Sequence, residues 1–199
     1  YGLVGITGKI TAYPAKHLAT LCNQMVNFLG IMQNEWAASQ SFSSFDTYLA
    51  PFVKADSLSY DKVKKCMEAF VFGVNTPSRW GTQAPFSHIS MDFKVPKDMA
   101  GEKAIVGGKK MGFTSGDCQD EMDMVNRAFL ETMLEGDANG QGFQSPIPSY
   151  GINADFDWSD TEQNRLLFSP ASRHGTPYFI NSVTGGAAQG AARVTYGDD

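Results

Sequence analysis

Alternating polar side chains between residues 88 and 92 have the types and spacing that could do chemistry. His88, Ser90 and Asp92 alternate with Ile89 and Met91, so a strand would place the three polar groups together on one face. A histidine beside a hydroxyl and a carboxylate has the groups that acid–base chemistry requires. The same pattern is also typical of a structural histidine whose hydrogen bonds are satisfied, and we favour that interpretation over a catalytic base.

A second polar group surrounds a turn. Asn75, Arg79 and Gln83 are spaced around Pro77 and Gly81, between an expected helix and an expected strand. Loops that end at a strand commonly carry ligand contacts. A network of capping and turn hydrogen bonds fits the same residues, and both interpretations stay open.

Two further features favour ordinary structural roles. His17 stands where a helix would begin, so it is either a solvated or capping side chain or an anion contact at a positive helix end. Four acids surround a tryptophan, and they are Asp155, Asp157, Asp160 and Glu162. Because these acids lack the spacing of a calcium loop, we expect a solvated acidic turn and no bound metal.

Common catalytic and redox motifs are missing from the chain. No GxSxG, HExxH or phosphate-loop pattern occurs. The three cysteines, Cys22, Cys66 and Cys118, are far apart and form no CxxC pair. A disulfide framework or zinc site is therefore improbable from the spacing, and we expect three reduced thiols in a reducing compartment.

The composition of the chain limits the kinds of partner that it could bind. The 199 residues are 42% hydrophobic and 19% charged, with a net charge of −5 and no basic block. This balance is typical of a folded protein with one ordinary core. It argues against broad binding to a nucleic-acid backbone, and no apolar run approaches the roughly 20 residues of a membrane helix.

The elements that would position these groups alternate along the chain. Apolar residues at spacings of three and four predict amphipathic helices at 14–36, 59–74 and 117–135. Strands are expected at 40–49, 85–93, 143–152 and 177–181, with a loop or hairpin at 97–117. Alternating strands and helices predict an α/β fold.

Several runs, in this order and spacing, resemble the catalytic subunit of the anaerobic, glycyl-radical (class III) ribonucleoside-triphosphate reductases. The runs are PAKH at 14–17, QNEW at 33–36, FSSFDTYLAPF at 42–52, NTPSRWGTQAPF at 75–86, EGDANG at 135–140, PIPSY at 146–150, DFDW at 155–158 and GTPYF at 175–179. The resemblance covers about residues 8–182, and it identifies the chain as an internal piece of such an enzyme.

The resemblance implies a fold and a chemistry. The fold is a ten-stranded α/β barrel, of which this chain would form a part, with strands alternating with amphipathic helices. In the family, a glycyl radical installed by an iron–sulfur, S-adenosylmethionine-dependent activase generates a thiyl radical on a cysteine. That thiyl radical removes hydrogen from the ribose, the 2′-hydroxyl leaves, and formate or a thiol system supplies the reducing equivalents, so that ribonucleoside triphosphates are reduced for DNA synthesis. The expected partners are the ribonucleotide substrate, dNTP or ATP effectors, the activase and a second subunit in a homodimer. The expected location is the cytoplasm.

The same resemblance suggests binding residues but no catalytic residue. Asn27 and Lys62 align with effector-binding positions, the lysine on phosphate and the amide on the base or sugar. Ser44 and Gln83 are candidates for lining the substrate channel. The radical cysteine and glycine are expected outside this chain, so the chain alone is expected to be inactive and to bind no cofactor.

The resemblance also suggests where the domain ends. Residues 1–182 would form the partial barrel with the effector and dimer helix, and residues 183–199 would form a divergent, small-residue tail without cysteine. A truncated or frameshifted reading frame is favoured over an added artificial end or an inserted element such as an intein. Two other functions stay open: an inert nucleotide-binding or dimerisation module, and another glycyl-radical enzyme.

Overall fold

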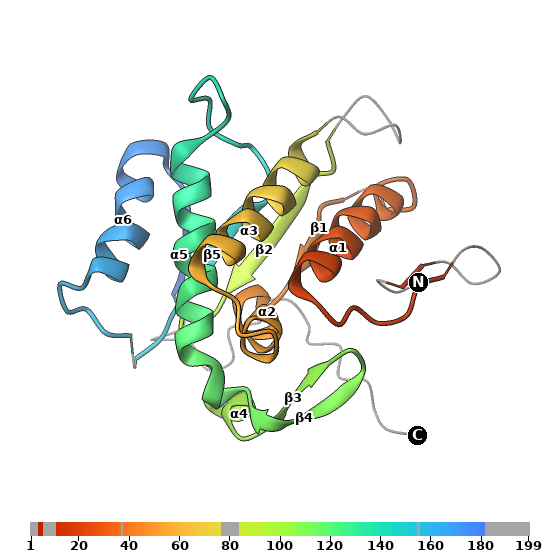
Figure 1. Cartoon of the computed structure of the whole chain (residues 1–199). Helices are drawn as coiled ribbons and strands as arrows, with labels where there is room; N and C mark the ends of the chain where they lie inside the picture. The colour runs from red at the N-terminus through yellow and green to blue at the C-terminus, as the bar shows by residue number, and fades with distance from the viewer. Residues whose placement is uncertain (1–3, 6–10, 37, 77–83, 155, 182–199) are drawn as a thin grey trace.

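The computed structural model describes residues 4–5, 11–36, 38–76, 84–154 and 156–181. Within these ranges the chain is a mixed α/β fold built on a four-stranded sheet in the order β1-β2-β5-β6 (Figure 1). The strands are β1 (Gln40–Phe42), β2 (Ser87–Met91), β5 (Ile147–Ile152) and β6 (Tyr178–Asn181).

All neighbouring strands of this sheet run parallel. Ser41 is level with His88 across β1 and β2, and Ser90 is level with Ser149 across β2 and β5. Since residues in register point to the same face of a sheet, the register fixes which side chains share each face. The parallel direction also brings the carboxyl ends of the four strands to one edge.

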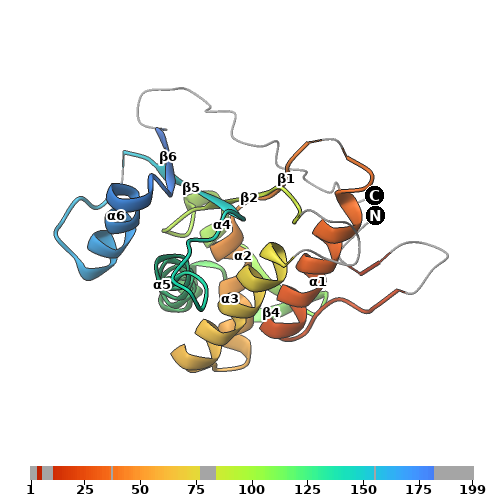
Figure 2. The same cartoon turned by 90° about the horizontal axis from the view of Figure 1, so that it is seen from above.

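Helices cover one face of the sheet. Figure 2 shows α1, α3 and α5 on the same side of β1, β2 and β5, with α6 beyond α5. The helices are α1 (Leu18–Met32), α2 (Phe45–Ala55), α3 (Tyr60–Asn75), α4 (Lys97–Ala100), α5 (Gln119–Glu135) and α6 (Glu162–His174), with a 3-10 turn at Gly116–Cys118. Ile89, Met91 and Tyr150 point toward this layer and are fully buried, so the main core lies between helices and sheet.

The apolar spacing explains α3 directly. The five residues predicted to face inward are all fully buried, and they are Val63, Met67, Phe70, Val71 and Val74. Ser59 stands at the N-cap position, as predicted, although its side chain makes no capping hydrogen bond. Burial of such an apolar stripe stabilises a helix far more than its intrinsic propensity does.

Helices α1 and α3 lie unusually close together. A Cβ atom added at Gly73 of α3 would meet Cγ2 of Val26 on α1 at 3.0 Å. Cys22 and Cys66 lie near each other across the same interface, one turn or more earlier on each helix. Because both contacts advance in the same chain direction, the two helices run parallel.

A small antiparallel hairpin fills the region that was expected to be a loop or hairpin. It consists of β3 (Lys103–Val106) and β4 (Lys109–Thr114). Its turn uses Gly107 and Gly108 at positive φ, which glycine adopts without a steric cost. The Gly107 N–H donates to the Ala15 carbonyl at 3.0 Å, so the hairpin braces the segment before α1.

One prediction about the elements is wrong. Residues 40–49 are not one strand, because β1 ends at Phe42 and helix α2 begins at Phe45. Phe45, Leu49, Phe52 and Val53 recur at helical spacing and are buried. Their burial outweighs the hydrogen bond that Pro51, inside the helix, does not donate.

Helix α6 was not predicted; it begins at Glu162, at the end of the acidic segment, and residues 157–160 before it form an exposed turn, as expected. Thr161 caps this helix by accepting a hydrogen bond from the Asn164 N–H at 3.1 Å. The remaining differences are at element ends: α1 begins at Leu18 rather than at residue 14, and Cys118 rather than Asp117 is the N-cap of α5.

The cysteines behave as predicted. Cys22, Cys66 and Cys118 are all free thiols, with Cys66 half-buried and the other two buried. No helix in the described part of the chain is long and apolar enough to cross a membrane.

Candidate functional site

A row of polar side chains runs along the sheet face opposite the helices and ends at the carboxyl edge. The row joins two segments, β1 with the start of α2, and β2 with the residue that follows it. Its members, which we call the polar row, are Ser41, Ser44, Thr47, His88, Ser90 and Asp92. As predicted from alternation, His88, Ser90 and Asp92 are all only partly buried, while Ile89 and Met91 between them are fully buried.

The polar row is paired rung by rung. The Ser41 hydroxyl lies 3.2 Å from His88 Nδ1, and the Ser44 N–H donates to Ser90 Oγ at 3.3 Å. At the carboxyl edge the Thr47 hydroxyl donates to Asp92 Oδ2 at 2.6 Å.

The spacing of these pairs follows from local structure. Every second residue of β2 faces the same side of the sheet. The other segment changes from strand to helix, and there every third residue contacts one of these β2 side chains. Ser44 makes this change with a φ of +51°, in the left-handed region that non-glycine residues seldom adopt.

The buried side-chain carboxylate of Asp46 stabilises the structure where strand β2 ends. Asp46 is completely buried, and its Oδ1 accepts from the N–H groups of Thr47 at 3.0 Å and Asp92 at 2.9 Å. Its Oδ2 accepts from the Phe93 N–H at 2.8 Å and Asn126 Nδ2 at 2.9 Å. One side chain on α2 thereby fastens the end of β2 to α5.

Burial raises the pKa of Asp46 from 3.8 to about 6, and the nearby Asp92 carboxylate adds to the effect. The hydrogen bonds from Asp92, Asn126 and Phe93 oppose the shift without cancelling it. Asp46 is therefore mainly ionised at neutral pH and becomes protonated under mildly acidic conditions.

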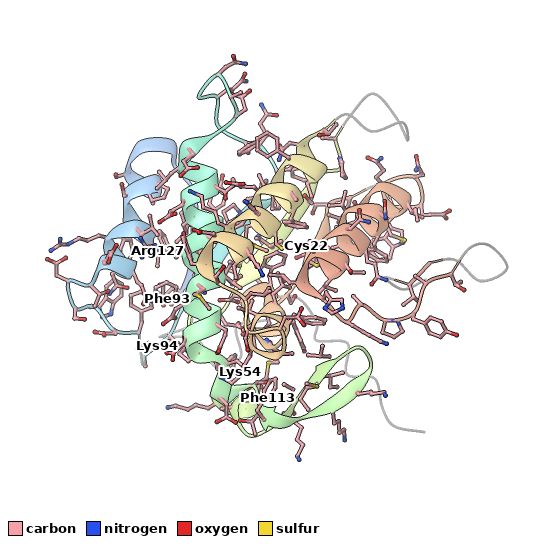
Figure 3. The ribbon with its side chains drawn as sticks, viewed as in Figure 1. Cys22, Lys54, Phe93, Lys94, Phe113 and Arg127 are labelled. Atoms are coloured by element: carbon pink, nitrogen blue, oxygen red, sulfur yellow. The ribbon has the colours of Figure 1, made fainter. Side chains whose placement is uncertain are left out.

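The bonds to Asp46 stabilise a strained turn. The Lys94 N–H donates to the Asp92 carbonyl at 2.7 Å, which closes a three-residue turn around Phe93 at a φ of +63°. A bulky aromatic residue at positive φ is an outlier, and such strain persists only where the surroundings enforce it. Figure 3 labels Phe93 and Lys94, which appear beside α5 in that view.

Aromatic packing secures the same turn from the other side. The Phe93 ring packs edge-on against Tyr150 at 5.8 Å and stacks on Phe156 at 5.8 Å. The Tyr150 hydroxyl donates to Asn126 Oδ1 at 3.1 Å, and burial raises the pKa of Tyr150 well above its ordinary value. Tyr150 thus stays neutral and acts as a hydrogen-bond donor.

His88 lies at the other end of the polar row, near the amino end of β2. Burial lowers its pKa, which keeps the imidazole neutral at pH 7. Ser41 is exposed and occupies Nδ1, and among the hydrogen bonds of the described residues none engages Nε2.

The structure places the predicted binding residues in different regions. Ser44 belongs to the polar row, while Gln83 and Arg79 lie outside the described residues. Asn27 on α1 and Lys62 on α3 are both exposed. Val26 is level with Gly73, which lies about 11 residues, or about 16 Å of helix, beyond Lys62. Asn27 and Lys62 could therefore contact opposite ends of an extended ligand, but not one atom.

Asn75 acts as a clamp at the opposite edge. Its Nδ2 donates to the Ser145 carbonyl, and its Oδ1 accepts from the Ser145 N–H at 3.1 Å. The structural alternative for this residue is thus confirmed. A groove of about 800 Å³ lies beside it at the amino ends of β2 and β5, with Phe72, Phe86 and Phe143 in its wall.

The charged clusters have protein partners. Asp160 pairs with Arg165 at 2.6 Å, and His17 Nδ1 lies 2.9 Å from Asp56. Among the described residues, no group of three or more His, Cys, Asp or Glu side chains is arranged to hold a metal ion.

A second groove, of about 590 Å³, lies between α5 and α6. There the Tyr60 hydroxyl donates to Glu131 at 2.5 Å and Arg127 donates to the same carboxylate at 2.9 Å. Burial first, and the adjacent Glu131 second, raise the pKa of Tyr60. Figure 3 shows Arg127 on the side of α5 that faces α6.

Sequence reasoning missed Asp46, Thr47 and Asn126, the residues that hold the polar row in place. Asn126 sits in a predicted helix whose apolar spacing could have revealed that a polar residue falls on the buried face, because it lies between Met122 and Leu130 at i+4 steps. Asp46 and Thr47 were hidden because their segment was expected to be a strand. A polar residue on a buried stripe requires a hydrogen-bond partner, and that was the available signal.

A family model supports the resemblance. The model of the anaerobic ribonucleoside-triphosphate reductases matches residues 1–196, a range that extends beyond Ser182. No curated protein sequence matches significantly.

Solved structures resemble the fold. The anaerobic ribonucleotide reductase of Thermotoga maritima in complex with dATP and CTP has a TM-score of 0.67 and 16% identity, covering 91% of this chain and 31% of that one. The same enzyme with citrate in the active site has a TM-score of 0.66 and 18% identity, covering 89% of this chain and 32% of that one. A further anaerobic ribonucleotide reductase has a TM-score of 0.61 and 18% identity, covering 81% of this chain and 27% of that one. The chain thus spans about a third of the length of these relatives.

Proposed function

Because the chain belongs to the anaerobic ribonucleoside-triphosphate reductase family, we propose that it forms part of a catalytic subunit that reduces ribonucleoside triphosphates to deoxyribonucleotides for DNA synthesis without oxygen. The observation that carries this proposal is the family match across residues 1–196. The fold likeness to reductases of low sequence identity supports it.

The sheet is proposed to belong to the ten-stranded barrel of this family. In the described part of the chain, β1 and β6 each have a strand on only one side, and open edges of a sheet are usually paired or covered. Helices cover one face, so the opposite face, with the polar row, would line the barrel interior. Ser44 would then lie in the substrate channel, and Gln83 remains a proposal for the same role.

We assign no radical step to the thiols of this chain. Cys22 and Cys118 are buried, and Cys66 is half-buried on α3. Cys22 is held between α1 and α3, on the helix side of the sheet. The glycyl radical that initiates hydrogen abstraction, the cysteine that it oxidises and the iron–sulfur activase would therefore be provided outside these residues.

The outer face of α1 and α3 is proposed as the effector and dimer surface. Asn27 and Lys62 are exposed there on parallel helices. A cationic lysine suits an effector phosphate, and an uncharged amide suits a base or sugar. Their separation along the helices fits contacts with the two ends of a nucleotide. Residues 1–182 would form the barrel segment, and 183–199 remain a proposed tail.

Reductase activity tests the proposal directly. The complete reductase chain carrying this sequence should, after anaerobic activation, convert CTP to dCTP. Its glycyl radical, detected by electron paramagnetic resonance, confirms that activation succeeded. A radical-bearing protein that binds nucleotides but forms no deoxyribonucleotide would instead support the inert nucleotide-binding or dimerisation module.

A further inference from the structure

The polar row itself carries no positive charge. Its hydrogen-bonding groups are hydroxyls, a neutral imidazole and, at the carboxyl edge, the Asp92 carboxylate. None of the members of the row is a lysine or an arginine. A phosphate requires cations or convergent N–H donors, so the row is poorly suited to a polyphosphate and well suited to neutral hydroxyl groups.

Within the row, His88 and Ser41 form a pair with unused hydrogen-bonding capacity. Ser41 is exposed and fixes Nδ1 of His88 at 3.2 Å. This contact orients the ring and leaves Nε2 as the ring nitrogen that no hydrogen bond among the described residues engages. By contrast, the Thr47 hydroxyl already donates to the Asp92 carboxylate, and Ser90 Oγ already accepts from the backbone N–H of Ser44.

We propose that His88, oriented by Ser41, binds a sugar hydroxyl of the nucleotide substrate through Nε2. This inference rests on the proposed function, because it requires that the face lines a ribonucleotide channel. The Ser41 contact sets the tautomer: a hydroxyl that donates to Nδ1 leaves Nε2–H as a donor, and one that accepts from Nδ1–H leaves Nε2 as an acceptor. The lowered pKa of His88, caused by burial, keeps either tautomer neutral.

Substrate binding to the complete, unactivated reductase chain provides the test. Equilibrium binding of CTP would be measured with dATP present at saturation, and binding of dATP alone would be measured separately. The variants are His88→Phe, His88→Gln and Ser41→Ala. Ser87→Ala is the matched control, because Ser87 is on the same strand but faces the helices, and its buried hydroxyl has no hydrogen-bond partner among the described residues.

We expect His88→Phe to weaken CTP binding by roughly fivefold to tenfold, which is the size of one neutral hydrogen bond. Ser41→Ala should weaken it less, and His88→Gln should restore part of the loss. Binding of 2′,3′-dideoxy-CTP should be insensitive to His88→Phe, because that ligand lacks the hydroxyl groups. Ser87→Ala should leave the affinities for CTP and dATP unchanged.

Each result separates the alternatives. An unchanged affinity of His88→Phe for CTP, or an equal loss for CTP and the dideoxy compound, overturns the inference while leaving the proposed function intact. A wild-type protein that binds neither CTP nor dATP refutes the proposed function itself. If His88→Phe loses dATP binding as well, it has failed to fold, and Ser41→Ala with His88→Gln then decides between the same two outcomes.

Discussion

Replacing Asp46 with asparagine should remove a pH dependence of stability that this carboxylate creates. The folded protein holds the Asp46 proton more tightly than the unfolded chain does, because burial raises the pKa from 3.8 to about 6. The contribution of Asp46 to stability is therefore greatest below pH 4, is lost as the pH rises through 6, and is constant above that.

The size of the effect follows from the shift. A difference of about 2.2 pKa units corresponds to about 3 kcal/mol of unfolding free energy between the two limits. Between pH 4.5 and pH 7, where folded protein is easier to study, about 2 kcal/mol of this should be seen. Asp46 is completely buried, so solvent screening does not reduce the figure.

Urea unfolding of wild type and Asp46→Asn across this pH range is the assay. The wild-type advantage over the variant should fall by about 2 kcal/mol from pH 4.5 to pH 7, and other titrating groups cancel in the difference. Asp61→Asn, an exposed change on α3, controls for the loss of one formal charge. A difference that stays flat, or that grows with pH, would mean that the four N–H donors outweigh burial and Asp92, and the reasoning would be refuted.

Three further predictions concern separate regions. Lys62→Ala should weaken effector binding by about tenfold or more, as expected for a charged hydrogen bond, and Asn27→Ala should weaken it severalfold; unchanged affinities, with Lys65→Ala as control, would reject these residues. Tyr60→Phe should lower the unfolding free energy by about 1–2 kcal/mol, because a bond to the Glu131 carboxylate is lost, and a melting temperature equal to wild type would contradict this. Ser44→Gly should preserve or slightly raise stability, because glycine accepts the φ of +51°. If the Ser44 hydroxyl lines the substrate channel, the same change should weaken CTP binding, and an unaltered CTP affinity would reject that role.

The parts of the fold that local pattern decides were predictable. Apolar residues recur at helical spacing throughout α3, and buried and partly buried residues alternate throughout β2. The sequence therefore favours a helix in the first segment and a strand in the second. Helix α2 was missed because Pro51 and the surrounding hydroxyl and aromatic residues contradict its propensity. Its helical state comes from burial against α5 and β2, which no local window contains.

The candidate site was only half visible for the same reason. Alternation predicted that His88, Ser90 and Asp92 share a face, but nothing in the sequence pairs them with Ser41, Ser44 and Thr47. That pairing needs a parallel register between segments more than 40 residues apart. It also needs the strand-to-helix change at Ser44.

The strained turn at Phe93 links these observations. Without the buried Asp46 carboxylate, an aromatic residue at a φ of +63° would relax toward an ordinary extended conformation. The Asp92 side chain would then move with the backbone and leave Thr47, since the Asp92 N–H is one of the four donors to Asp46. The polar row would lose the contact between Thr47 and Asp92. His88 and Ser41 are held by the β1–β2 register and would keep their contact with each other. Asp46→Asn should consequently disturb the Asp92 end and leave the His88 end in place, so the two ends of one sheet face can be tested independently of each other.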